Sequence, residues 1–214
     1  MTDAPPTAAE LASAVARFRA EGRPGVVVTP RYRLRFVEWG ASSRPPVVFV
    51  HGMADRAVSF APVMARLVDA GFRCVGYELA NGRCDGANLG MYRHRHFADD
   101  LGCLADYLGG PVDLFGPSFG STIAQRALAT TPVRFRRCVL QGSFARRPLW
   151  WLERGLCRLG RYWPWLMGEL PVRERVMRRL EAAQFAGCPA EVFAFLLANS
   201  GATPCRAAAR RTLI

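Results

Sequence analysis

The stretch that most constrains the fold runs from Val112 to Gly120. The apolar run Val112 to Phe115 predicts a short buried strand, and the residues from Ser118 onward have a helical pattern. Ser118 therefore stands on a turn between a strand and a helix, with Gly116 and Gly120 two residues to either side. Such a turn forces its central residue into a sparsely allowed backbone conformation, and the glycines remove Cβ atoms that would collide. The pattern predicts a strained turn that exposes the Ser118 hydroxyl.

The same turn predicts a place for negative charge. Phe119 follows the serine at the start of the helix, so we expect its N–H to point toward a position where an oxyanion would sit.

Strand and helix patterns alternate along the rest of the chain. Strands are expected at 26–28, 32–37, 47–50, 74–77, 112–115 and 137–141. Helices are expected at 7–21, from an N-cap at Ser59 to Gly71, from near Phe97 to 108, and from Ser118 onward. Alternation of this kind indicates a parallel sheet with helices on both faces and a ligand site at the carboxyl ends of its strands. We therefore expect an α/β fold with a mainly parallel sheet of about six strands.

The chain divides by pattern into an N-terminal helix (1–24), an α/β core (25–144) and a helical segment (145–214). In the last part leucines recur at three- and four-residue spacing with arginines off that stripe, and 12 arginines stand against 5 glutamates. A basic, tryptophan-rich helix would suit an anionic membrane surface, but we interpret it as a helix packed over the active site. Its apolar side chains indicate a substrate with an apolar group.

Composition limits the class of protein and its partners. A chain of 214 residues, half of them hydrophobic, suits one globular domain with a sizeable core. The net charge is +12, but all 29 basic residues are arginines spread along the chain, which indicates coding bias, and no nucleic-acid partner is expected. Seven cysteines without a C-x-x-C pair indicate reduced thiols in a cytoplasmic protein. No signal peptide and no membrane-spanning helix are expected.

The strand that leads into His51 and Gly52, the Ser118 turn and the later helical segment together resemble the α/β-hydrolase fold family. The resemblance implies that Ser118 is the nucleophile of a serine hydrolase that cleaves an ester or related acyl bond in a small molecule. It also implies that the backbone N–H groups of Met53 and Phe119 form the oxyanion hole, and that residues 145–214 form a cap or lid. His51 and Gly52, like Gly116 and Gly120, would shape the site. A serine at this position argues against the haloalkane-dehalogenating branch of the family, which uses aspartate there.

The sequence departs from the family in its acid and base. In the family the acid and the histidine follow the nucleophile, whereas His51, His94 and His96 all precede Ser118 and no aspartate occurs after residue 144. We therefore expect a fragment that lacks the last two strands and is inactive as written. The alternative is a non-catalytic binding protein with the same fold. We expect neither His94 nor His96 to replace the base, and neither a metal site at these histidines nor a cofactor.

Overall fold

The computed structural model describes residues 5–41, 43–52, 55–80, 87, 92–143 and 188–199. The elements in chain order are α1 (Ala8–Glu21), β1 (Arg23–Val28), β2 (Arg33–Gly40), β3 (Val47–Phe49), the 3₁₀ helix η1 (Ala57–Phe60), α2 (Ala61–Asp69), β4 (Arg73–Tyr77), α3 (His94–Tyr107), β5 (Val112–Pro117), α4 (Phe119–Thr130), the 3₁₀ helix η3 (Pro132–Arg134), β6 (Phe135–Gln141) and α8 (Ala190–Asn199). The expected helices within 145–187 lie outside the described residues.

The six strands form one sheet in the order β1-β2-β4-β3-β5-β6. The hairpin strands β1 and β2 are antiparallel to their neighbours, and β4, β3, β5 and β6 are parallel. The predicted α/β fold with a mainly parallel sheet is confirmed. β6 lies at an edge of this sheet and exposes Val139 and Leu140.

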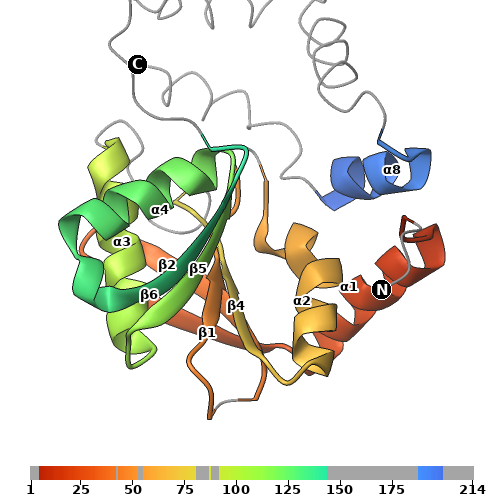
Figure 1. The fold of residues 1–214 in the computed structure, drawn as a ribbon, viewed down its shortest axis with the longest axis horizontal. Coiled ribbons are helices and arrows are strands. Elements are labelled where there is room, and N and C mark those ends of the chain that lie inside the picture. Colours follow the sequence, from red (N-terminus) through yellow and green to blue (C-terminus); the bar gives the residue numbers. More distant parts are fainter. Residues whose placement is uncertain are drawn as a thin grey trace, which may run out of the picture.

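Helices cover both faces of the sheet (Figure 1), because its central strands are apolar on both sides. Val48 points into a cluster that α3 and α4 close, whereas its neighbour Phe49 points into a second cluster with α1 and α2. Both side chains are fully buried. The parallel strands β3, β4 and β5 are adjacent, so the segments that follow them leave the sheet at the same edge.

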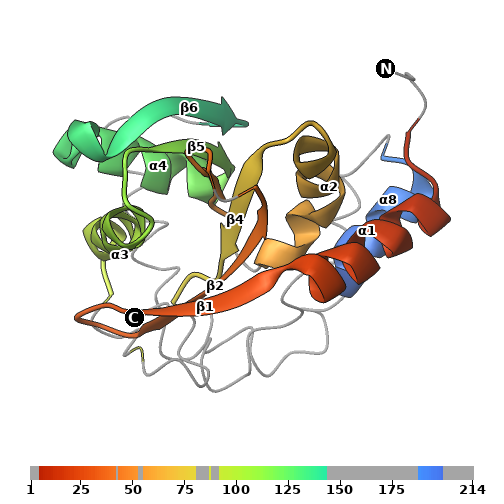
Figure 2. The same ribbon diagram turned by 90° about the horizontal axis from the view of Figure 1, so that it is seen from below.

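The N-terminal helix α1 is tied to the sheet. Its N-cap Thr7 and Glu10 form a capping box, which satisfies free amides of the first turn. At its other end Phe18 packs edge-to-face on Trp39 of β2, whose indole nitrogen donates to Glu21 (2.9 Å). Helix α8 lies beside α1 in both views (Figures 1 and 2). No helix in the described ranges has the length and apolar character needed to cross a bilayer.

Two helix starts differ from the sequence-based expectation. Ser59 was expected to be the N-cap, but it lies inside η1 and its hydroxyl donates to Asp55 (2.5 Å), so α2 begins at Ala61. Pro62 suits the first turn of α2, because a proline lacks the N–H that would have no acceptor within the helix at that position. Helix α3 begins at His94, three residues before Phe97.

Candidate active site

Ser118 has the backbone conformation that the sequence predicts. It stands between β5 and α4 with φ 49° and ψ −120°, and it is the one non-glycine residue with positive φ in the described part of the chain. Its side chain is exposed. The Ser118 N–H donates to the carbonyl of Gln141 (2.9 Å), and its own carbonyl accepts from the N–H of Ser121 (3.0 Å). Hydrogen bonds on both sides therefore hold a conformation that an L-residue rarely adopts.

The glycines around Ser118 allow β5, α4 and β3 to approach one another. A Cβ on Gly116 would lie 2.8 Å from the Gly120 carbonyl oxygen, and a Cβ on Gly120 would overlap the carbonyl oxygen of Val50. Gly52 is close as well, because a Cβ on it would lie 3.8 Å from the Ser118 Cβ. The loop after β3 thus lies beside the serine.

Phe119 is the first residue of α4, so its N–H has no acceptor within the helix and lies at the positive end of the helix dipole. This N–H could therefore donate a hydrogen bond to an anion beside Ser118. Met53, the other expected oxyanion donor, lies outside the described residues. Its role stays a prediction.

His51 is buried, and both nitrogens of its ring face the backbone. Nδ1 lies 2.8 Å from the Gly52 carbonyl oxygen, and Nε2 accepts from the N–H of Leu79 (3.0 Å). The second bond connects the loop after β3 to the segment that follows β4. The sequence analysis missed Glu78, whose carboxylate lies 3.8 Å from Nε2. Its position directly after a parallel strand was the available signal, because such residues meet at one edge of the sheet.

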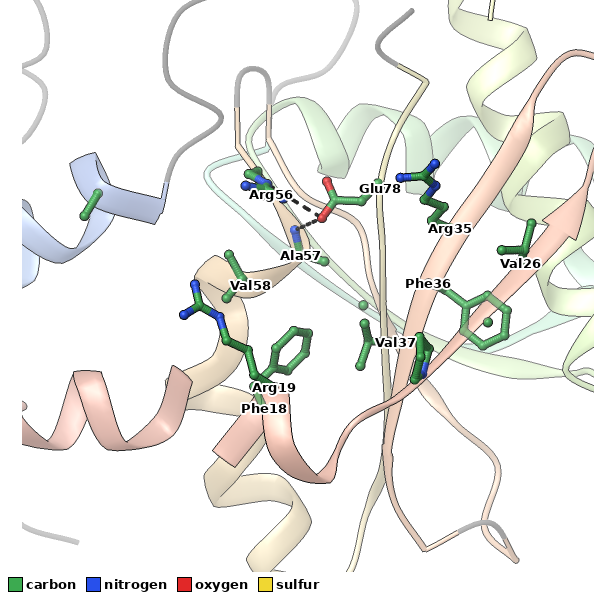
Figure 3. Close-up of a pocket in the computed structure, with 14 residues that line it drawn as sticks. Phe18, Arg19, Val26, Arg35, Phe36, Val37, Arg56, Ala57, Val58 and Glu78 are labelled. Carbon is green, nitrogen blue, oxygen red and sulfur yellow. Dashed lines mark hydrogen bonds and ion pairs between the residues drawn. The ribbon is translucent and has the colours of Figure 1, made fainter. Parts of the chain in front are cut away.

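Glu78 also borders a pocket of about 630 Å³ on the α1 and α2 side of the sheet (Figure 3). Its lining includes three arginines and several apolar side chains: Arg19, Arg35, Arg56, Phe18, Val26, Phe36, Val37 and Val58. The Glu78 carboxylate accepts from the Ala57 N–H (3.3 Å) and lies 4.0 Å from Arg56. Ser118 does not line this pocket, whereas Glu78 borders it and also lies near His51.

His94 lies beside the helix that follows the serine turn. Its ring contacts the ring of Phe119 (6.1 Å between centroids), and its Nε2 lies 3.0 Å from the Thr122 hydroxyl. That hydroxyl donates to the carbonyl of Phe119 (2.8 Å), so we assign the hydrogen of the first contact to Nε2. His94 thus supports the first turn of α4 through Phe119 and Thr122.

The residues from His94 to Asp100 at the start of α3 make hydrogen bonds and ion pairs within the protein. His96 Nδ1 accepts from the N–H of Arg93 (3.1 Å), and Arg31 pairs with both Asp99 and Asp100. Within the described ranges, no three His, Cys, Asp or Glu side chains converge as metal ligands would.

Asp100 is a buried carboxylate on the α3 side of the sheet. Burial raises its pKa above 3.8, although the Tyr92 hydroxyl (2.8 Å) and the Arg31 guanidinium (3.1 Å) favour the charged form. The folded state then binds a proton more tightly than the unfolded state. This carboxyl should therefore lower stability as pH rises from about 3.8 through its raised pKa.

We expect Asp100→Asn to remove this pH dependence. Between pH 4 and pH 7 the change in the free energy of unfolding should be less favourable for the parent chain than for the variant. This expectation concerns the two slopes and not the difference in stability at any one pH. Urea denaturation at several pH values measures both slopes. Parallel slopes for the two proteins would show that Asp100 has an ordinary pKa in the folded state.

The sheet, its helices and the serine turn are together those of an α/β-hydrolase. The family model for serine aminopeptidase, S33, matches residues 41–192, and the chain belongs to this family of hydrolases. No curated protein matches the chain significantly.

Solved structures of other hydrolases share the fold. A hydrolase from Pseudomonas aeruginosa PA01 is 16% identical with a TM-score of 0.66, over 89% of this chain and 71% of that one. Epoxide hydrolase VrEH1 from Vigna radiata is 18% identical with a TM-score of 0.63, over 90% and 72%. Carboxylesterase CesB from Bacillus subtilis is 19% identical with a TM-score of 0.53, over 62% of this chain and 47% of its own length. At these identities the likeness concerns the fold alone, and the chain spans about half the length of CesB.

Proposed function

We propose that the chain has the nucleophile and oxyanion site of a serine hydrolase that acts on an ester or related acyl bond. Ser118 is the nucleophile, and the N–H groups of Phe119 and Met53 receive the charge of the tetrahedral oxyanion. The observation that carries the proposal is the positive φ of an exposed serine at the junction of β5 and α4. Strain at a non-glycine residue persists where the surrounding structure holds it, and such residues cluster at functional sites.

The serine favours acyl substrates over epoxides, although the similar structures include both esterases and epoxide hydrolases. Attack of Ser118 on a carbonyl carbon forms an ester to the protein, the alcohol leaves, and water can then cleave the new ester. Attack of the same oxygen on an epoxide would open the ring and leave an ether, which water does not cleave. Turnover with a serine nucleophile therefore requires an acyl group.

A non-catalytic binding protein is the second candidate function. The observation in its favour is the order of the chain, because no histidine follows Ser118 in these 214 residues. A binding protein needs neither the Phe119 N–H as an oxyanion donor nor a reactive group at position 118. A test of the oxyanion site that does not depend on a base separates the two.

The Ser118→Cys variant provides this test, because a thiolate reacts without a neighbouring base. Its sulfur attacks 4-nitrophenyl acetate, the carbonyl oxygen becomes an oxyanion, and 4-nitrophenolate leaves as the thioester forms. Iodoacetamide alkylates the same sulfur by displacing iodide, and no oxyanion forms. With an oxyanion site, the ratio of acylation to alkylation rates should exceed that of N-acetylcysteine by about a hundredfold.

Mass spectrometry of the peptide that carries position 118 measures both rates, with fragment ions separating it from Cys103. A ratio equal to that of N-acetylcysteine would refute the proposed function and favour the binding protein.

A further inference from the structure

Ser121 is a fully buried serine in the first turn of α4, with an exposed fraction of 0%. Its N–H and its hydroxyl both donate to one acceptor, the carbonyl oxygen of Ser118, at 3.0 Å and 2.6 Å. The chain thus directs two hydrogen-bond donors of one residue to the residue that we propose as the nucleophile.

The hydrogen bond from the Ser121 hydroxyl is of a common type, but its acceptor has a special position. Serine and threonine hydroxyls often donate to the carbonyl three residues earlier in a helix. Thr122 does so within α4, to the carbonyl of Phe119 at 2.8 Å. The acceptor of Ser121, however, belongs to the peptide unit that joins Ser118 to Phe119, and this unit also carries the Phe119 N–H.

The peptide unit is planar, so a force that fixes the direction of its carbonyl also fixes the direction of its N–H. Hydrogen bonds to the carbonyl oxygen also polarise the unit, which makes the N–H a stronger donor. Both effects matter most at a strained turn, where the backbone has other conformations available. Because Ser121 is buried, water cannot take the place of its hydroxyl.

We propose that Ser121 is a positioning residue for the oxyanion site. Its hydroxyl holds the peptide unit between Ser118 and Phe119 and strengthens the Phe119 N–H as a donor. This inference rests on the proposed function, in which that N–H receives the oxyanion. It assigns to Ser121 an effect on the reaction at position 118 without any contact with the substrate.

The test adds Ser121→Ala to the Ser118→Cys background and repeats the two rate measurements. Acylation by 4-nitrophenyl acetate should slow by about fivefold, as expected when a donor loses up to a third of its contribution. Alkylation by iodoacetamide should keep its rate, because no oxyanion forms. Ser121→Thr, which retains the hydroxyl, should retain the parent ratio.

Thr122→Val is the matched control, because its hydroxyl bonds the next peptide unit. It should leave the ratio of the two rates unchanged. An unchanged ratio in Ser121→Ala, or an equal fall in both rates, would overturn the proposal. Loss of folding in Ser121→Ala, seen by circular dichroism, would overturn it as well, because the hydroxyl would then serve the fold. If instead the parent Ser118→Cys ratio matches that of N-acetylcysteine, the proposed function itself fails.

Discussion

The 214-residue chain is expected to hydrolyse 4-nitrophenyl butyrate about a million-fold more slowly than a serine hydrolase that also has the acid and the histidine. The reason is that the Ser118 hydroxyl must lose its proton as it attacks, and the described histidines are engaged elsewhere. His51 faces the backbone with both ring nitrogens, and His94 Nε2 contacts Thr122. Initial rates of 4-nitrophenolate release from the purified chain measure the turnover.

The control for this prediction is Ser118→Ala, measured beside the parent. If the parent and Ser118→Ala release 4-nitrophenolate at the same slow rate, the result agrees with a Ser118 that has no base to accept its proton. Rapid turnover that Ser118→Ala abolishes would show that a base is present in these residues. His94→Gln would then be the variant to test first, because His94 contacts Phe119 directly.

The sequence predicted those parts of the site that depend on neighbours in the chain. The Ser118 turn follows from an apolar run, two glycines and a helical pattern within nine residues, so its positive φ could be anticipated. The strands of the parallel sheet were predictable for the same reason, since burial on both faces leaves a continuous apolar run. Local patterns therefore predicted the fold and the strained turn at Ser118.

Contacts between distant segments could not be predicted in the same way. Glu78 comes close to His51 because β3 and β4 are adjacent in the sheet, and His94 reaches Phe119 because α3 packs beside α4. Such partners depend on the strand order and on side-chain directions, which a pattern of residue types does not specify.

The Gly120→Ala variant is expected to lose about 3 kcal/mol or more of its free energy of unfolding. A Cβ at this position would overlap the Val50 carbonyl oxygen and lie 3.0 Å from that of His51, so α4 and β3 must separate. Gly102→Ala in α3 is the control. Its Cβ would meet the end of the flexible Arg134 side chain at 3.0 Å, and alanine favours a helix by about 1 kcal/mol over glycine. Urea denaturation of both variants gives the comparison. If Gly120→Ala proved as stable as Gly102→Ala, β3 and α4 could not be in the close contact on which the position of Ser118 depends.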